Sequence, residues 1–117
     1  MRKFLAIALA AVCVFALCSC TPDESDIKEA FKENGYVVNS MDSIYAVSFG
    51  VDVDDVEYVL LAIGQDNSST VYVVGFKDKK AAKEFYNKNK VKEGANFRIK
   101  RKGSVVTFGS EQGVELF

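Results

Sequence analysis

Two short apolar runs, residues 57–63 and 70–76, dominate the centre of the chain, and residues typical of turns separate them. Both runs predict strands, and apolar side chains fall on both faces of each. Strands of this kind are usually central in a sheet and covered on both sides. One face carries Tyr58, Leu60, Val71 and Val73. We expect these side chains to lie in the core; without a covering helix they would form a surface for a partner or small ligand.

Three further segments alternate between apolar and polar residues, as strands with one buried face do. Residues 44–51 place Tyr45, Val47, Phe49 and Val51 on one face, so we predict a strand there, preceded by a link over residues 39–42. Residues 96–101 and 104–109 flank Lys102-Gly103 and predict a hairpin. Its inward side chains are expected to be Phe97, Ile99, Val106 and Phe108.

A first helix is predicted from Ile27, Ala30 and Phe31, which fall at helical spacing. It ends at Asn34-Gly35, a typical C-terminal cap. Its start is either Thr21, as the N-cap of a capping box with Glu24, or a position nearer Ser25. The sequence therefore predicts a helix whose far end is better defined than its beginning.

A second helix is predicted over residues 79–89, with Asp78 as its N-cap, and a last short helix begins at Ser110. The resulting order is α-β-β-β-α-β-β-(α), with short connections that favour antiparallel pairing. We predict an α+β fold in which two or three helices pack on a four- or five-stranded, mainly antiparallel sheet.

The first twenty residues follow a different pattern, in which Arg2 and Lys3 precede an uncharged run from Phe4 to Leu17. As a helix, this run of fourteen residues is only about 21 Å long, whereas a bilayer core is ~30 Å thick and needs ~20 apolar residues. The length therefore disfavours a permanent membrane span.

The run ends in Leu17-Cys18-Ser19-Cys20, which resembles a bacterial lipobox. The resemblance implies that residues 1–19 are a signal peptide, and that Cys20 receives a diacylglyceryl thioether and becomes the mature N-terminus. Plain secretion and an uncleaved anchor are the alternatives.

The same resemblance implies the organisation of the whole chain. Residues 20–25 would be the lipidated N-terminus and a short tether, and residues 26–117 a single small domain. The protein would be lipid-anchored to a membrane on the exported side of the bacterial cell envelope, within the ~20 Å that a six-residue tether spans. Because Cys13 and Cys18 leave with the signal peptide, we expect the domain to fold without a disulfide or a metal.

Composition excludes several chemistries, because the chain contains no His and no Trp. Nucleophile pairs with His, His-ligated zinc and imidazole acid–base catalysis are therefore excluded. Glycine-rich nucleotide-binding motifs are missing too, and we expect no cofactor. Carboxylate, lysine, tyrosine and serine chemistry remains.

Charge is divided unequally along the mature chain. Residues 20–66 contain eleven acidic and two basic residues, whereas residues 67–117 contain five acidic and eleven basic ones. We therefore expect a dipolar domain surface. The densest acidic group is Asp52, Asp54, Asp55 and Glu57. It lacks the spacing of an EF-hand loop, so we interpret it as a solvated turn and not as a calcium site.

A basic group near the C-terminus is the candidate binding site of the sequence. It consists of Lys88, Lys90, Lys92, Arg98, Lys100, Arg101 and Lys102. Near a membrane, such a group would contact anionic lipid headgroups or anionic wall polymers. The alternative is a face that only keeps the hairpin soluble. Nucleic acid is disfavoured by the exported location and the negative net charge of the mature chain.

These observations favour a small membrane-anchored exported lipoprotein that acts as a binding or accessory module, with an unknown ligand and an unknown protein partner. The alternative is a small hydrolase or other enzyme that uses carboxylates or a lysine in place of His.

Overall fold

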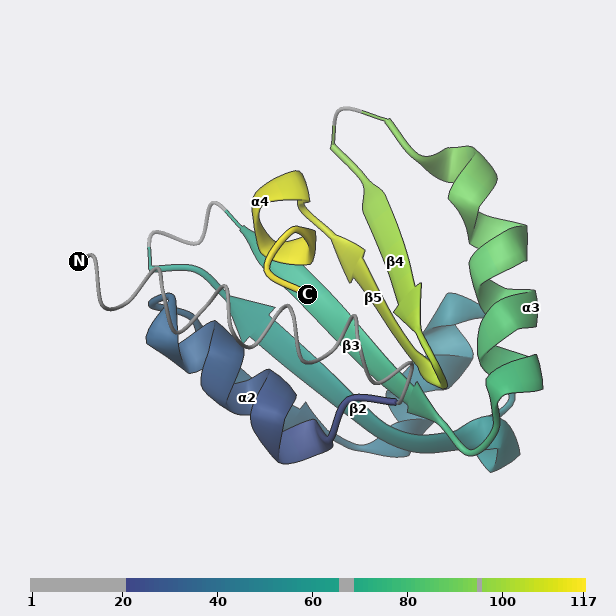
Figure 1. The fold of residues 1–117 in the computed structure, drawn as a ribbon. Coiled ribbons are helices and arrows are strands. Elements are labelled where there is room, and N and C mark those ends of the chain that lie inside the picture. The colour runs from purple at the N-terminus through teal and green to yellow at the C-terminus, as the bar shows by residue number, and fades with distance from the viewer. Residues whose placement is uncertain (1–20, 66–68, 95) are drawn as a thin grey trace.

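The described residues form a five-stranded antiparallel sheet in the order β1-β2-β3-β5-β4 (Figure 1). The computed structural model describes residues 21–65, 69–94 and 96–117. The predicted signal peptide (residues 1–19) and Cys20 lie outside the described residues. The strands are β1 (Val37–Met41), β2 (Val56–Ile63), β3 (Thr70–Phe76), β4 (Arg98–Lys102) and β5 (Val105–Gly109).

Helices cover both faces of this sheet. The helices α2 (Glu24–Glu33) and α4 (Glu111–Val114) pack on one face, and α3 (Lys79–Asn89) and the 3-10 helix η1 (Ser43–Phe49) pack on the other. Shorter 3-10 helices, η2 (Val53–Asp55) and η3 (Lys90–Lys92), precede β2 and follow α3. The predicted α+β fold with an antiparallel sheet is therefore confirmed.

β2 and β3 lie inside the sheet, where both of their faces are covered, as their apolar composition predicts. Leu60, Val71 and Val73 are fully buried beneath α2 and α4, and Tyr58 packs at the edge of the same cluster. Ile27 and Phe31 of α2 supply the covering side chains. The second apolar face is therefore core and not a binding surface.

The predicted strand over residues 44–51 is wrong, because this segment forms η1 and the first strand is β1, seven residues earlier. The Asp42 carboxylate accepts a hydrogen bond from Ile44 N (3.1 Å) and caps the 3-10 helix, which Gly50 ends with a φ of 81°. Side chains three apart share one face of a 3-10 helix, so Ala46 and Phe49 point inward. Of the four side chains predicted to share one face, Phe49 and Val51 pack against the core, whereas Tyr45 and Val47 are exposed.

Of the two predicted starts of the first helix, the capping box at Thr21 is wrong and the later start near Ser25 is confirmed, because α2 begins at Glu24. The N-cap of α2 is Asp23, and the Thr21 hydroxyl bonds to Ser104 in place of the helix. The other predicted caps are confirmed: the Asp78 carboxylate accepts from Ala81 N (2.8 Å), and the Ser110 hydroxyl accepts from Gly113 N (3.4 Å). The hairpin is also confirmed, with its turn at residues 103 and 104.

Candidate functional site

Thr21, the first described residue, is fixed to the turn between β4 and β5. Its Oγ1 accepts a hydrogen bond from Ser104 N (3.1 Å) and lies 3.2 Å from Ser104 Oγ. Gly103 has a φ of 60°, and a Cβ at this position would collide with the Thr21 side chain. Pro22, the next residue, is buried. The folded structure therefore includes residues that the sequence assigns to a tether.

The connection between β3 and α3 meets the β4–β5 turn at the same end of the sheet, and η2 adjoins that connection. Phe76 N donates to Ser104 O (2.8 Å), and Lys77 N donates to Asp55 O (2.9 Å). Figure 1 shows this turn and the beginnings of α2 and α3 at one end of the molecule. We call this region the Thr21 end. It comprises Thr21, residues 77–80 and residues 101–104.

The structure divides the basic residues that the sequence groups together. Arg101 and Lys102 lie at the Thr21 end, and Lys100 lies next to them along β4. The Arg101 guanidinium donates to Gly103 O (2.9 Å). The Lys102 ammonium lies 5.3 Å from the centroid of the Phe117 ring, and burial, followed by repulsion from Lys100, lowers the pKa of Lys102.

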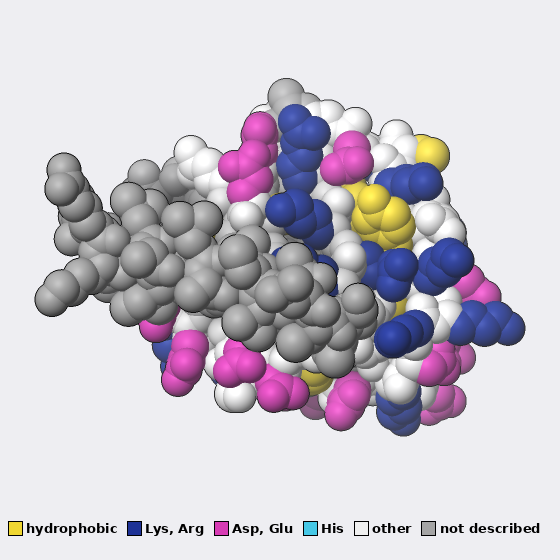
Figure 2. Space-filling model, viewed as in Figure 1, with side chains coloured by type: hydrophobic (Ala, Val, Ile, Leu, Met, Phe, Trp, Pro, Cys, Tyr) yellow, Lys and Arg dark blue, Asp and Glu magenta, His cyan; other side chains and the backbone are white. Residues whose placement is uncertain are grey.

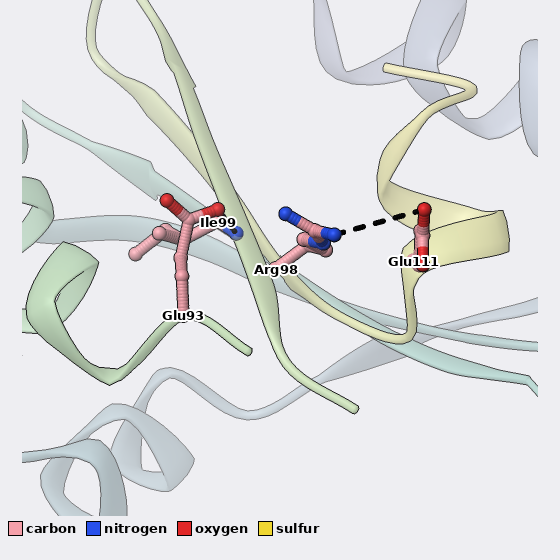
Figure 3. A network of polar contacts seen from close by, with 4 residues as sticks. All are labelled: Glu93, Arg98, Ile99 and Glu111. Carbon is pink, nitrogen blue, oxygen red and sulfur yellow. Dashed lines mark hydrogen bonds and ion pairs between the residues drawn. The ribbon is translucent and has the colours of Figure 1, made fainter. Parts of the chain in front are cut away.

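The other basic residues of the group lie away from this end. They are Lys88, Lys90 and Lys92, at the end of α3 and in η3, and Arg98. Figure 3 shows the Arg98 guanidinium turned toward Glu111 of α4, with which it forms an ion pair at 3.8 Å. Glu93 lies on the opposite side of β4, where its carboxylate accepts from Ile99 N (3.3 Å).

Sequence reasoning gave little weight to the lysines at the beginning of α3. Lys77, Lys79 and Lys80 are exposed at the Thr21 end, close in space to a turn some 25 residues later in the chain. Their position was nevertheless a sequence signal for a role at the surface. The helix dipole disfavours positive charges at a helix N-terminus, so these lysines do not stabilise α3. In Figure 2, basic side chains gather over β4 and α3, and acidic ones follow α2 along the lower edge.

The acidic group Asp52, Asp54, Asp55 and Glu57 surrounds η2 and the start of β2, and all four residues are exposed. Asp52 Oδ1 accepts from Asp54 N (3.0 Å), so this carboxylate caps the 3-10 turn. Within the described ranges, no group of three or more acidic or Cys side chains is placed to hold a metal ion. The arrangement is that of a solvated, locally capped turn.

An open cleft of about 620 Å³ lies beside Thr21, between the start of α2 and β2. Asp23, Glu24, Glu57, Lys28 and Tyr58 are among its lining residues. The Tyr58 hydroxyl is buried and contacts no hydrogen-bonding partner among the described residues. Burial, and then the nearby carboxylates led by Glu24, raise the pKa of Tyr58. This phenol therefore stays protonated, and it can donate a hydrogen bond but cannot act as a base.

Large exposed apolar side chains are frequent between residues 37 and 53, a stretch that contains the wrongly predicted strand over residues 44–51. Among the described residues, five of them fall between residues 37 and 53: Val37, Ile44, Tyr45, Val47 and Val53. We call these the η1 apolar group. Val91 is exposed far from them in the chain, on η3. The Asp42 cap and Gly50 were the sequence signals for η1, from which the exposure of Ile44, Tyr45 and Val47 follows.

In the part of the chain that the structure describes, none of the helices combines the length and apolar character needed to cross a membrane. No protein family, curated protein or solved structure matches the chain. The function must therefore be argued from the residues and their geometry.

Proposed function

We propose that this protein is a small lipoprotein of the bacterial cell envelope, anchored through a lipid on Cys20, and that it serves there as a binding or accessory module. The observation that carries the proposal is the segment Leu17-Cys18-Ser19-Cys20 at the end of an uncharged run behind Arg2 and Lys3. The described fold begins at once after this segment, with Thr21 held against the β4–β5 turn. This supports a site of attachment directly at the domain.

The surface chemistry favours a binding module over an enzyme. Basic side chains concentrate at the Thr21 end, and the η1 apolar group is exposed, as in proteins that contact a partner or a membrane. An enzyme without His would need a desolvated carboxylate or lysine in a cleft. In the cleft beside Thr21, however, Asp23 and Glu57 are exposed, and the half-buried Glu24 and Lys28 are paired with each other (3.3 Å).

Labelling with palmitate tests the anchor. The full chain expressed in bacteria should incorporate labelled palmitate, and Cys20→Ala should abolish the incorporation. Cys18→Ala is the matched control, because it removes the neighbouring thiol and leaves the acceptor in place. Retention of the label in Cys20→Ala would overturn the proposal. An unlabelled soluble product would indicate plain secretion, and an unlabelled membrane-bound product of full length an uncleaved anchor.

A further inference from the structure

The Thr21–Ser104 contact leaves almost no chain between the proposed lipid and the folded domain. Cys20 and Thr21 are consecutive, and consecutive Cα atoms are ~3.8 Å apart. Thr21 is bonded to Ser104, and Pro22 is buried. A lipid on Cys20 would therefore hold the Thr21 end at the bilayer surface, without the six-residue tether that the sequence suggests.

The basic residues of the Thr21 end lie on two adjacent segments. Lys77, Lys79 and Lys80 are exposed, and Arg101 is half-buried on β4, next to the adjacent turn. These residues come from two segments that the hydrogen bond from Phe76 N to Ser104 O (2.8 Å) holds together. Their relative positions are therefore set by the ends of β3, β4 and β5, and do not depend on a flexible loop.

Acidic residues are also present at this end, but they are engaged locally or lie toward α2 and η2. The Asp78 carboxylate caps α3, and Glu24 forms an ion pair with Lys28 (3.3 Å). Asp55 of η2 is exposed and adjoins Lys77, whose backbone N donates to Asp55 O (2.9 Å), and Asp23 precedes α2. The β4–β5 turn and the start of α3 thus carry the basic residues of the Thr21 end, and Asp55 lies at their border.

We propose that Lys77, Lys79, Lys80 and Arg101 form a docking surface for anionic lipid headgroups, and that the Thr21–Ser104 contact holds the domain on the membrane in one orientation. The inference rests on the proposed lipid at Cys20. The same chemistry would attract an anionic wall polymer. Lipid is favoured because Thr21, one residue from the anchor, bonds to Ser104, and Ser104 in turn bonds to Phe76, which directly precedes Lys77.

Depth-dependent quenching tests the orientation. Once the signal peptide is removed and Cys20 is acylated, an introduced cysteine is the single thiol of the chain. Lys80→Cys and Lys92→Cys are a matched pair: both replace an exposed lysine, one at the beginning of α3 and one beyond its end. Each lipidated protein is labelled with a fluorophore and reconstituted into phosphatidylcholine vesicles that carry a headgroup quencher.

With phosphatidylglycerol added to about a third of the lipid, we expect at least threefold stronger quenching at residue 80 than at residue 92. Equal quenching at the two sites would overturn the fixed orientation. Six Gly and Ser residues inserted between Cys20 and Thr21 leave the Thr21–Ser104 contact intact but restore a tether. In vesicles of phosphatidylcholine alone, this insertion should bring the ratio of the two quenching values close to one.

The lipid contact is tested by replacing the basic side chains. With Lys77, Lys79 and Arg101 changed to Gln, phosphatidylglycerol should no longer raise the quenching at residue 80. An unchanged response would overturn the docking surface. Binding of a soluble anionic polymer, with no response to phosphatidylglycerol, would overturn it in favour of wall polymers. Failure of palmitate labelling defeats the proposed function, whereas a labelled protein with equal quenching defeats this inference alone.

Discussion

The two outer strands of the sheet are built from opposite kinds of residue. β4 carries four basic side chains around the buried Ile99, whereas β1 contains no charge and contributes Val37 to the η1 apolar group, whose other members follow it in the chain. Charged side chains on an edge strand discourage pairing with another chain, and an uncharged edge lacks this protection. The difference separates a charged edge, at whose end we propose the anionic contact, from an uncharged edge whose backbone lacks protection against pairing with another chain.

The largest expected difference between the edges concerns their attachment to the core. Ile99 of β4 is 3% exposed, whereas Val37 of β1 is 62% exposed. Ile99→Ala should lower the free energy of unfolding by about 2–5 kcal/mol, because it leaves a cavity between the sheet and α3. Val37→Ala should change it by less than about 0.5 kcal/mol. Urea unfolding followed by circular dichroism measures the free energy of unfolding of both variants. Similar decreases would show that side-chain packing attaches β1 to the core as strongly as it attaches β4.

The glycines beside the two edges allow a second comparison. Gly103 and Gly50 both have positive φ angles, but a Cβ would collide with Thr21 at Gly103 and would meet nothing within 4 Å at Gly50. Gly50→Ala should cost about 1 kcal/mol from backbone conformation. Gly103→Ala should cost about 2–3 kcal/mol, since it adds a steric collision. Equal losses of unfolding free energy would indicate that the Thr21 contact contributes nothing.

Self-association tests the apolar character of the β1 side. Val47 (56% exposed) belongs to the η1 apolar group, and Val91 (80% exposed) is its matched control outside the group. Val47→Lys should raise the concentration at which the protein associates by about tenfold, which corresponds to ~1.4 kcal/mol. Sedimentation or light scattering measures the effect. If Val91→Lys raises that concentration equally, general charge and not the η1 apolar group controls association.

The smallest effect is expected from the ion pair at the far end of β4. Arg98 and Glu111 lie 3.8 Å apart, and both side chains are substantially exposed. Arg98→Gln should therefore reduce the free energy of unfolding by no more than about 0.5 kcal/mol, and the difference should vanish in 1 M salt. A loss that persists at high salt would mean that Arg98 contributes by packing and not by charge.

The segments that were predicted well contain signals that agree with one another. β2 and β3 are apolar on both faces and lie inside the sheet, and α3 has both a helical apolar stripe and the Asp78 cap. Residues 44–51 carry conflicting signals, because alternation favours a strand while Asp42 and Gly50 favour a short helix. The choice between them depends on which segment pairs with β2, and β1 does so along all five of its residues.

The candidate site, like the fold, could be predicted from the sequence only in part. The sequence by itself determined the α+β class, the basic character of β4 and the lipobox-like segment, because these depend on composition and on short-range spacing. Only the tertiary structure decided that Thr21 bonds to Ser104, 83 residues away, and that Lys77 to Lys80 lie beside Arg101 while Lys88 to Lys92 lie apart. Such proximity depends on the pairing of strands that are far apart in the chain. Short-range sequence patterns do not indicate which distant segments will become neighbours.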